Sequence, residues 1–75
     1  MKELLEILAA NIVDNPDDIY VKQTVNGDVI TLELHAAPED MGKVIGKQGR
    51  IAKAIRNVVK AAAIHQNKRV LVEIV

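Results

Sequence analysis

Apolar residues recur at helical spacing near the start of the chain. Between Lys2 and Val13, Leu4, Leu5, Leu8 and Ile12 follow the i, i+4, i+8 spacing of an amphipathic helix. The segment 14–18, Asp-Asn-Pro-Asp-Asp, then interrupts the pattern, because proline and short polar side chains favour turns. We therefore expect a helix over residues 2–13, followed by a turn.

The pattern next changes to the alternation that is typical of β-strands. We expect one strand over residues 19–25 and a second over residues 28–36, in which Ile30, Leu32 and Leu34 alternate with polar residues. Asn26-Gly27, between the two strands, is a common pair for a two-residue hairpin turn, because these residues accept positive φ angles. One face of this hairpin is therefore expected to be buried and the other exposed.

The second half of the chain predicts two helices and a last strand. A short helix begins at Pro38-Glu39-Asp40, where proline fits the first turn and carboxylates face the positive end of the dipole. Glycines at 46 and 49 limit its length, a long helix follows over residues 50–65, and a strand covers residues 69–75. The order α-β-β-α-α-β predicts one α+β domain over residues 1–75, with a three-stranded mixed sheet covered on one face by three helices.

Composition excludes several classes of protein. Hydrophobic residues make up 49% of the 75 residues, which is enough for one small core. The chain has no cysteine, which excludes disulfides and thiolate sites, and no apolar run approaches the ~20 residues of a membrane span. His35 and His65 lie far apart with no further ligands nearby, so we expect no metal, no cofactor and a cytoplasmic location.

Charge is divided sharply along the chain, although the net charge is zero. Residues 1–40 carry two basic and nine acidic residues, a net charge of −7, whereas residues 41–75 carry eight basic and one acidic residue, a net charge of +7. The division could help the two halves to fold together, or it could give the protein a basic face for a polyanion. The position of the basic residues favours the second interpretation.

Most of these basic residues surround one loop. In Val44-Ile45-Gly46-Lys47-Gln48-Gly49-Arg50, glycines bound a four-residue connection between two helices. Glycine permits positive φ angles and close approach of a ligand to the backbone, and the second helix directs its free N–H groups and positive dipole at the loop. Lys43, Lys47, Arg50 and Lys53 add cations. Together these features favour a phosphate ligand, above all a polynucleotide backbone.

Gly46-Lys47-Gln48-Gly49, preceded by Val44-Ile45, resembles the GxxG loop of KH domains, which bind single-stranded nucleic acid. The element order is similar to the bacterial type II KH topology, and the whole chain resembles the KhpA family of small bacterial single-KH proteins. One departure is Ala52, which occupies a position where KH domains usually carry a larger aliphatic residue. This departure leaves open which aliphatic residues line a base-binding groove.

The resemblance and the local charge together define the expected RNA contacts. The GxxG loop would hold about four nucleotides through the backbone, with Lys47 and Gln48 facing the phosphates. Aliphatic groove residues are expected at Val44, Ile45 and opposite them on the second strand, since Tyr20 is the only aromatic residue available for stacking. The full expected set is Lys43, Val44, Ile45, Gly46, Lys47, Gln48, Gly49, Arg50, Lys53 and Arg56.

Two functions remain open at this point, and neither is enzymatic. The first is a non-enzymatic RNA-binding protein, an RNA chaperone or post-transcriptional regulator as the family resemblance implies. The second is a protein–protein adaptor in complex with a larger KH-containing partner. Lys47 and the basic half favour RNA. A nucleotide-binding enzyme is excluded because no Gly-Lys-Ser/Thr motif follows a strand.

The long helix carries more apolar surface than one small sheet needs. Ala52, Ile55, Val59 and Ala62 form one stripe that could cover the sheet, and a second stripe runs through Ala54, Val58, Ala61 and His65, with Ile64 at its edge. The second stripe could mediate a homodimer, or a heterodimer with a protein of the Jag (KhpB) type, which the resemblance implies as a partner. Alternatively, the first helix or the short second helix covers it.

Overall fold

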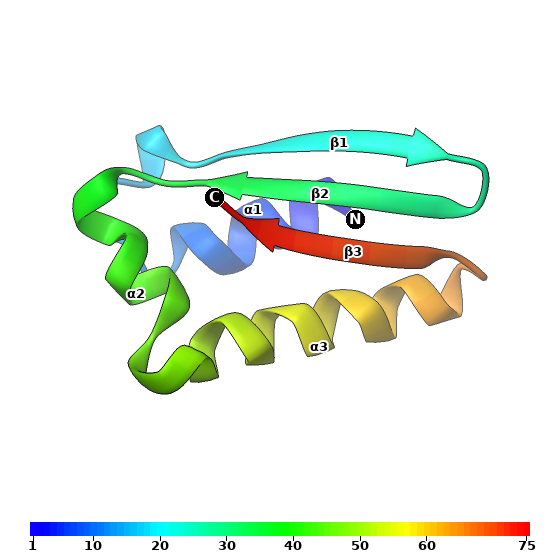
Figure 1. Cartoon of the computed structure of the whole chain (residues 1–75). Helices are drawn as coiled ribbons and strands as arrows, with labels where there is room; N and C mark the ends of the chain where they lie inside the picture. The colour runs from blue at the N-terminus through cyan, green and yellow to red at the C-terminus, as the bar shows by residue number, and fades with distance from the viewer.

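In the computed structural model, which describes all of residues 1–75, three helices lie on one side of a three-stranded sheet (Figure 1). Short 3₁₀ turns cover Pro16–Asp18, Pro38–Asp40 and Lys47–Gly49. The helices and strands are α1 (Lys2–Ala10), β1 (Tyr20–Asn26), β2 (Val29–His35), α2 (Met41–Ile45), α3 (Arg50–His65) and β3 (Arg69–Ile74). The predicted α+β fold class and element order are confirmed.

The sheet is mixed, as predicted. Strand β2 lies in the centre, antiparallel to β1 and parallel to β3. Val21 pairs with Leu34 across the antiparallel ladder, and Ile30 pairs with Val70 across the parallel one. The parallel pairing requires a crossover, which the segment α2–loop–α3 provides. The outer edges of β1 and β3 are therefore unpaired.

The first helix ends earlier than the apolar pattern predicts, at Ala10 rather than at Val13. Asn11 terminates it, since its Nδ2 donates a hydrogen bond to the carbonyl of Ile7 at 2.9 Å. Ile12 and Val13 nevertheless pack against the core from the following turn. Ile12 and Val13 are apolar because they are buried. The spacing of apolar residues predicted their burial but did not show that they lie in a turn rather than in the helix.

The hairpin turn is displaced by one residue from its predicted place. Asn26 and Val29 pair as the last residues of the ladder, so the two turn residues are Gly27 and Asp28. Gly27 takes the positive φ angle, 65°, which places glycine at the first turn position rather than the second. Hairpin turns accept glycine at either position, and the register here is set by the buried face of β2.

One face of the sheet forms the core with residues from all three helices. Its buried strand residues are Val21, Ile30, Leu32, Leu34, Val70 and Val72, and the helices contribute Leu5, Ala9, Val44, Ile55, Val59 and Ala63. The predicted stripe of α3 is confirmed except at its end, where Ala63 is buried in place of Ala62. None of the helices combines the length and hydrophobicity that a membrane span requires.

The second apolar stripe of α3 is not covered by any other element. Ala54, Val58 and Ala61 are exposed, as are Ile64 and His65 at the end of the helix. Val58 keeps 47% and Ile64 73% of its surface accessible. The alternative that α1 or α2 covers this stripe is therefore wrong.

Candidate nucleic-acid interface

The turn between α2 and α3 needs glycine at its first position. Gly46 has φ 75° and ψ 176°, a combination that is almost restricted to glycine. A Cβ at this residue would also lie only 2.6 Å from Cγ1 of Ile51. Ile51 of α3 thus packs directly over the Gly46 backbone, and this close contact sets the angle at which α3 leaves the turn.

The rest of the loop presents its two variable residues to solvent. Gln48 and Gly49 are both left-handed, with φ angles of 58° and 74°, and the left-handed region is unusual for a residue such as glutamine. Lys47 and Gln48 are exposed. A strained backbone at an exposed loop often marks a functional site. Here the strained turn between Gly46 and Gly49 exposes the side chains of Lys47 and Gln48 to solvent.

Cations that form no ion pair follow the loop into α3. The chain forms only two ion pairs, His35–Glu33 and Lys43–Asp14, so Lys47, Arg50 and Lys53 are unpaired. Arg50 Nη2 lies 3.4 Å from Gln48 Oε1, which links the loop to the first turn of α3. Because α3 has 16 residues, its N-terminal dipole adds to the positive potential at this point.

Lys43 differs from the other predicted contacts, since its ammonium group is paired with the Asp14 carboxylate. This hydrogen bond with Asp14, against the opposing effect of partial burial, raises the pKa of Lys43 above its ordinary value. Lys43 is therefore permanently charged at neutral pH but partly neutralised. Its position next to the loop is as predicted, whereas its availability to a ligand is reduced.

The prediction that Val44 lines a base-binding groove is wrong. Its side chain is 0% exposed and belongs to the hydrophobic core, because α2 turns this residue toward the sheet. The neighbouring Ile45 is exposed and remains available at the surface. Ala52 is buried as well, so its small side chain faces the core and Ile51, rather than Ala52, packs against the loop.

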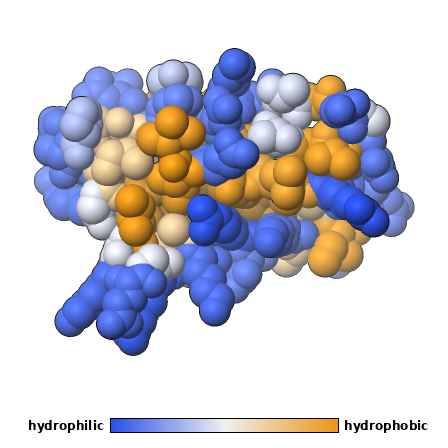
Figure 2. All heavy atoms as spheres, in the orientation of Figure 1, coloured by the Kyte–Doolittle hydropathy of each residue, from blue (hydrophilic) through white to orange (hydrophobic).

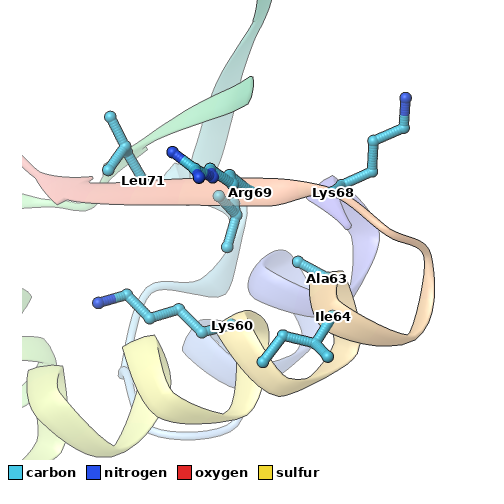
Figure 3. A pocket seen from close by; sticks show the side chains of 7 residues that line it. Lys60, Ala63, Ile64, Lys68, Arg69 and Leu71 are labelled. Carbon is cyan, nitrogen blue, oxygen red and sulfur yellow. The ribbon is translucent and has the colours of Figure 1, made fainter. Parts of the chain in front are cut away.

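The proposed groove partner on the second strand is also wrong, because β2 is the central strand and its buried face is covered. The accessible depression lies instead between α3 and the unpaired edge of β3 (Figure 3). This pocket has a volume of about 310 Å³ and is lined by Lys60, Ala63, Ile64, Lys68, Arg69, Val70 and Leu71. Periodicity does not reveal the strand order, and only that order identifies β3 as an edge strand next to α3.

Arg56, which the sequence predicts as a further RNA contact, has a structural partner on β3. Its Nε donates a hydrogen bond to the backbone carbonyl of Val72 at 3.2 Å. With Lys53 and Lys60 at helical spacing on either side of Arg56, the basic stripe of α3 faces the β3 edge. Figure 2 shows an apolar band across this side of the molecule, with hydrophilic atoms projecting at the lower left, where Figure 1 places the turn between α2 and α3.

Neither histidine belongs to the site. The imidazole of His35 stacks on the ring of Tyr20 at a centroid distance of 4.3 Å, and its Nε2 lies 3.7 Å from a Glu33 oxygen. These contacts lie on the face of the sheet that carries no helix, away from the loop. No group of three His, Cys, Asp or Glu residues is arranged to hold a metal ion.

The element order, the mixed sheet and the glycine-bounded loop between two helices together define a KH domain of the type II topology. The chain belongs to the KhpA/KhpB family of KH domains, since the model described as "KhpA/KhpB, KH domain" matches residues 2–74.

Relatives agree with the family assignment, and solved structures agree with the fold. The RNA-binding protein KhpA of Clostridium perfringens is 64% identical over the full length of both chains, and that of Listeria monocytogenes is 41% identical over all of this chain and 99% of its own. The fold is also similar to part of Aquifex aeolicus Era, with a TM-score of 0.71 at 22% identity, over 97% of this chain and 28% of Era. A structure of Era with a segment of 16S ribosomal RNA matches equally well, at 21% identity.

Proposed function

We propose that this protein binds single-stranded RNA through the GxxG loop and acts in the bacterial cytoplasm as an RNA chaperone or post-transcriptional regulator. The observation that carries the proposal is the exposed, left-handed turn that presents Lys47 and Gln48 beside unpaired cations of α3. The names of its full-length relatives, which are RNA-binding proteins, support it. The function is binding, and no residue is assigned a catalytic role.

Each residue of the loop has a distinct role in this proposal. Lys47 contacts a phosphate by charge and Gln48 by its amide, while Gly46 and Gly49 allow the backbone to approach the strand. Arg50 and Lys53 continue the phosphate track along the first turns of α3. Lys43 contributes long-range potential while it remains paired with Asp14.

The bases then lie in the cleft between α3 and the β3 edge. Ile45 and Ile51 are exposed near the loop end of this path, and the bond from Arg56 to the Val72 carbonyl joins α3 to β3 between the loop and the cleft. Four of the seven residues that line the cleft are aliphatic, and the other three, Lys60, Lys68 and Arg69, are exposed, flexible cations. Such a lining provides little fixed hydrogen-bond geometry to discriminate between bases. We therefore expect modest affinity and weak sequence preference.

Binding of RNA should depend on salt and on strand state. With two to four phosphate contacts, the slope of log K against log salt for single strands is about −0.7 per contact, or roughly −1.5 to −3 in all. Fluorescence anisotropy with an unstructured RNA between about 50 and 200 mM salt measures it. A perfect RNA duplex, which hides its base edges, is the comparison. Equal or better affinity for the duplex would contradict binding in the α3–β3 cleft.

The uncovered stripe of α3 supports a second proposal, that the protein self-associates or pairs with a KhpB-type KH protein through this helix. The stripe combines the small residues Ala54 and Ala61 with the exposed Val58 and Ile64. Small side chains let two helices approach closely, and a domain of this size gains stability from added buried surface. This surface would also serve the alternative function, a protein–protein adaptor.

Two substitutions test self-association. Val58→Tyr and Ala61→Arg should each convert a dimer into a folded monomer, because a large or charged side chain prevents close helix packing. Light scattering at tens of micromolar protein, with circular dichroism for folding, measures the result. Gln66→Arg adds the same charge just beyond α3 and should leave the dimer intact. A wild-type monomer would refute self-association, and a folded dimeric variant would place the contact elsewhere.

A further inference from the structure

Asp40 is the only charged residue in the buried interior, with 1% of its surface exposed. Its carboxylate accepts three hydrogen bonds from the turn that follows α1. The backbone N–H of Asp14 donates to Oδ1 at 3.3 Å, and the backbone N–H and side-chain Nδ2 of Asn15 both donate to Oδ2 at 3.0 Å. The bonds join segments that are 25 and 26 residues apart in the chain.

The position of Asp40 makes this arrangement informative. Asp40 is the N-cap residue of α2, where aspartate normally accepts a hydrogen bond from its own helix, yet its side chain makes no such bond. The carboxylate is used instead to hold a distant turn. Burial by itself would raise the pKa of Asp40, but the hydrogen bonds from Asn15 and Asp14 outweigh it and lower the pKa below its ordinary value. The group is therefore ionised at neutral pH.

Further contacts tie the same two segments together. The Lys43 ammonium pairs with the Asp14 carboxylate, and Asn15 Nδ2 also lies 3.3 Å from Glu39 Oε1. Helix α2 has only five residues, too few to be stable by itself. Its orientation must therefore come from Val44 in the core and from this cluster at its beginning. Gly46 follows directly at its other end.

We propose that Asp40 is a positioning residue for the GxxG loop: its buried carboxylate holds α2 against the 14–15 turn and so sets the pose in which Lys47 and Gln48 meet RNA. The proposal rests on the proposed RNA-binding function and adds a residue that lies outside the loop. A residue of this kind contacts no ligand. It acts because a recognition element must be held close to its productive geometry by the residues behind it.

The substitution Asp40→Asn separates geometry from charge. It removes a negative charge, which by electrostatics alone would strengthen binding to a polyanion, yet it places an amide NH₂ against donor groups. We expect RNA affinity to fall about threefold to tenfold, the effect of roughly one hydrogen bond. The matched control is Asp17→Asn, which removes the same charge from an exposed residue that forms no ion pair. The RNA affinity of Asp17→Asn should equal that of the wild type or be slightly higher. Wild-type or higher affinity in folded Asp40→Asn would overturn the proposal.

A second readout needs no RNA, so that failure of this proposal and failure of RNA binding can be told apart. Amide hydrogen exchange of residues 44–49 should accelerate severalfold in Asp40→Asn, while the central strand β2 stays protected. Asn15→Ala, which removes one donor but keeps the charge of Asp40, provides a milder variant if Asp40→Asn does not fold. If the amides of residues 44–49 exchange at the wild-type rate in folded Asp40→Asn, Asp40 stabilises the domain without positioning the loop, and the proposal is wrong. If wild-type protein fails to bind RNA while the loop exchange changes as expected, the RNA-binding proposal is the one refuted.

Discussion

The double substitution Lys47→Asp with Gln48→Asp should abolish measurable RNA binding while the domain stays folded. Both side chains are exposed and neither contributes to the core, so the free energy of unfolding should change little. One unit charge at 4 Å from a phosphate is worth about 1 kcal/mol in bulk water and more near a protein surface. Reversing the charge of Lys47 alone therefore costs about 2 kcal/mol, a roughly 30-fold loss of affinity. The second carboxylate, introduced in place of Gln48, adds to this loss.

The chain offers a control with the same two residue types in the same order. Lys22 and Gln23 are adjacent and exposed on β1, so Lys22→Asp with Gln23→Asp makes the same change in net charge far from the loop. Anisotropy with a short single-stranded RNA measures binding, and circular dichroism measures folding. If both double variants lose affinity equally, net charge rather than the loop governs binding. Retained binding in a folded loop variant would move the site away from Gly46–Gly49.

Gly46→Ala should be the most damaging single methyl addition in the protein. Its φ and ψ angles belong to a region that costs a residue with a Cβ about 1–3 kcal/mol, and the added methyl would lie 2.6 Å from the Ile51 side chain. We expect a loss of about 2–3 kcal/mol in the free energy of unfolding. For a domain of this size the melting temperature should fall by about 10–20 °C. RNA affinity should fall with it, because relief of the contact requires Ile51 and α3 to shift.

Gly42→Ala is the matched control, in the same short segment. Gly42 lies within α2 with no atom within 4 Å of a Cβ and an ordinary φ angle, so alanine should stabilise the helix by about 0.5–1 kcal/mol. The two alanine variants should thus change the melting temperature in opposite directions. A Gly46→Ala protein with wild-type melting temperature and affinity would show that the turn does not need this backbone conformation.

The fold could be predicted from the sequence because each element has a strong local pattern. The alternation of apolar and polar residues in β2 and the apolar stripe of α3 both indicate which side chains are buried. The glycines of the loop indicate where α2 ends and α3 begins. Errors occurred where local patterns have two explanations. Ile12 and Val13 continue a helical pattern but are buried in a turn, and Gly27 fits either position of a hairpin turn.

The site was only partly predictable, for a different reason. Lys47, Gln48 and the glycines belong to one continuous segment, so their proximity needs no tertiary information. The burial of Val44, the cleft beside β3 and the bond from Arg56 to Val72 depend instead on how α2 and α3 cross over to a parallel strand. Asp40 was placed correctly at a helix start, but its partners are 25 and 26 residues away. No spacing rule points to Asn15.

The parallel pairing of β2 with β3 also has a consequence for the order in which the domain folds during its synthesis. The β1–β2 hairpin can form early, since its contacts are local, but α3 buries Ile55 and Val59 against a sheet that includes β3. Strand β3 is the last of the three to leave the ribosome, and long-range parallel pairing forms slowly. Until β3 pairs with β2, the apolar face of α3 therefore lacks part of the sheet against which it packs, and the loop at Gly46–Gly49 lacks part of its support. We therefore expect the pairing of one short strand, Arg69–Ile74, to complete the fold that supports the loop.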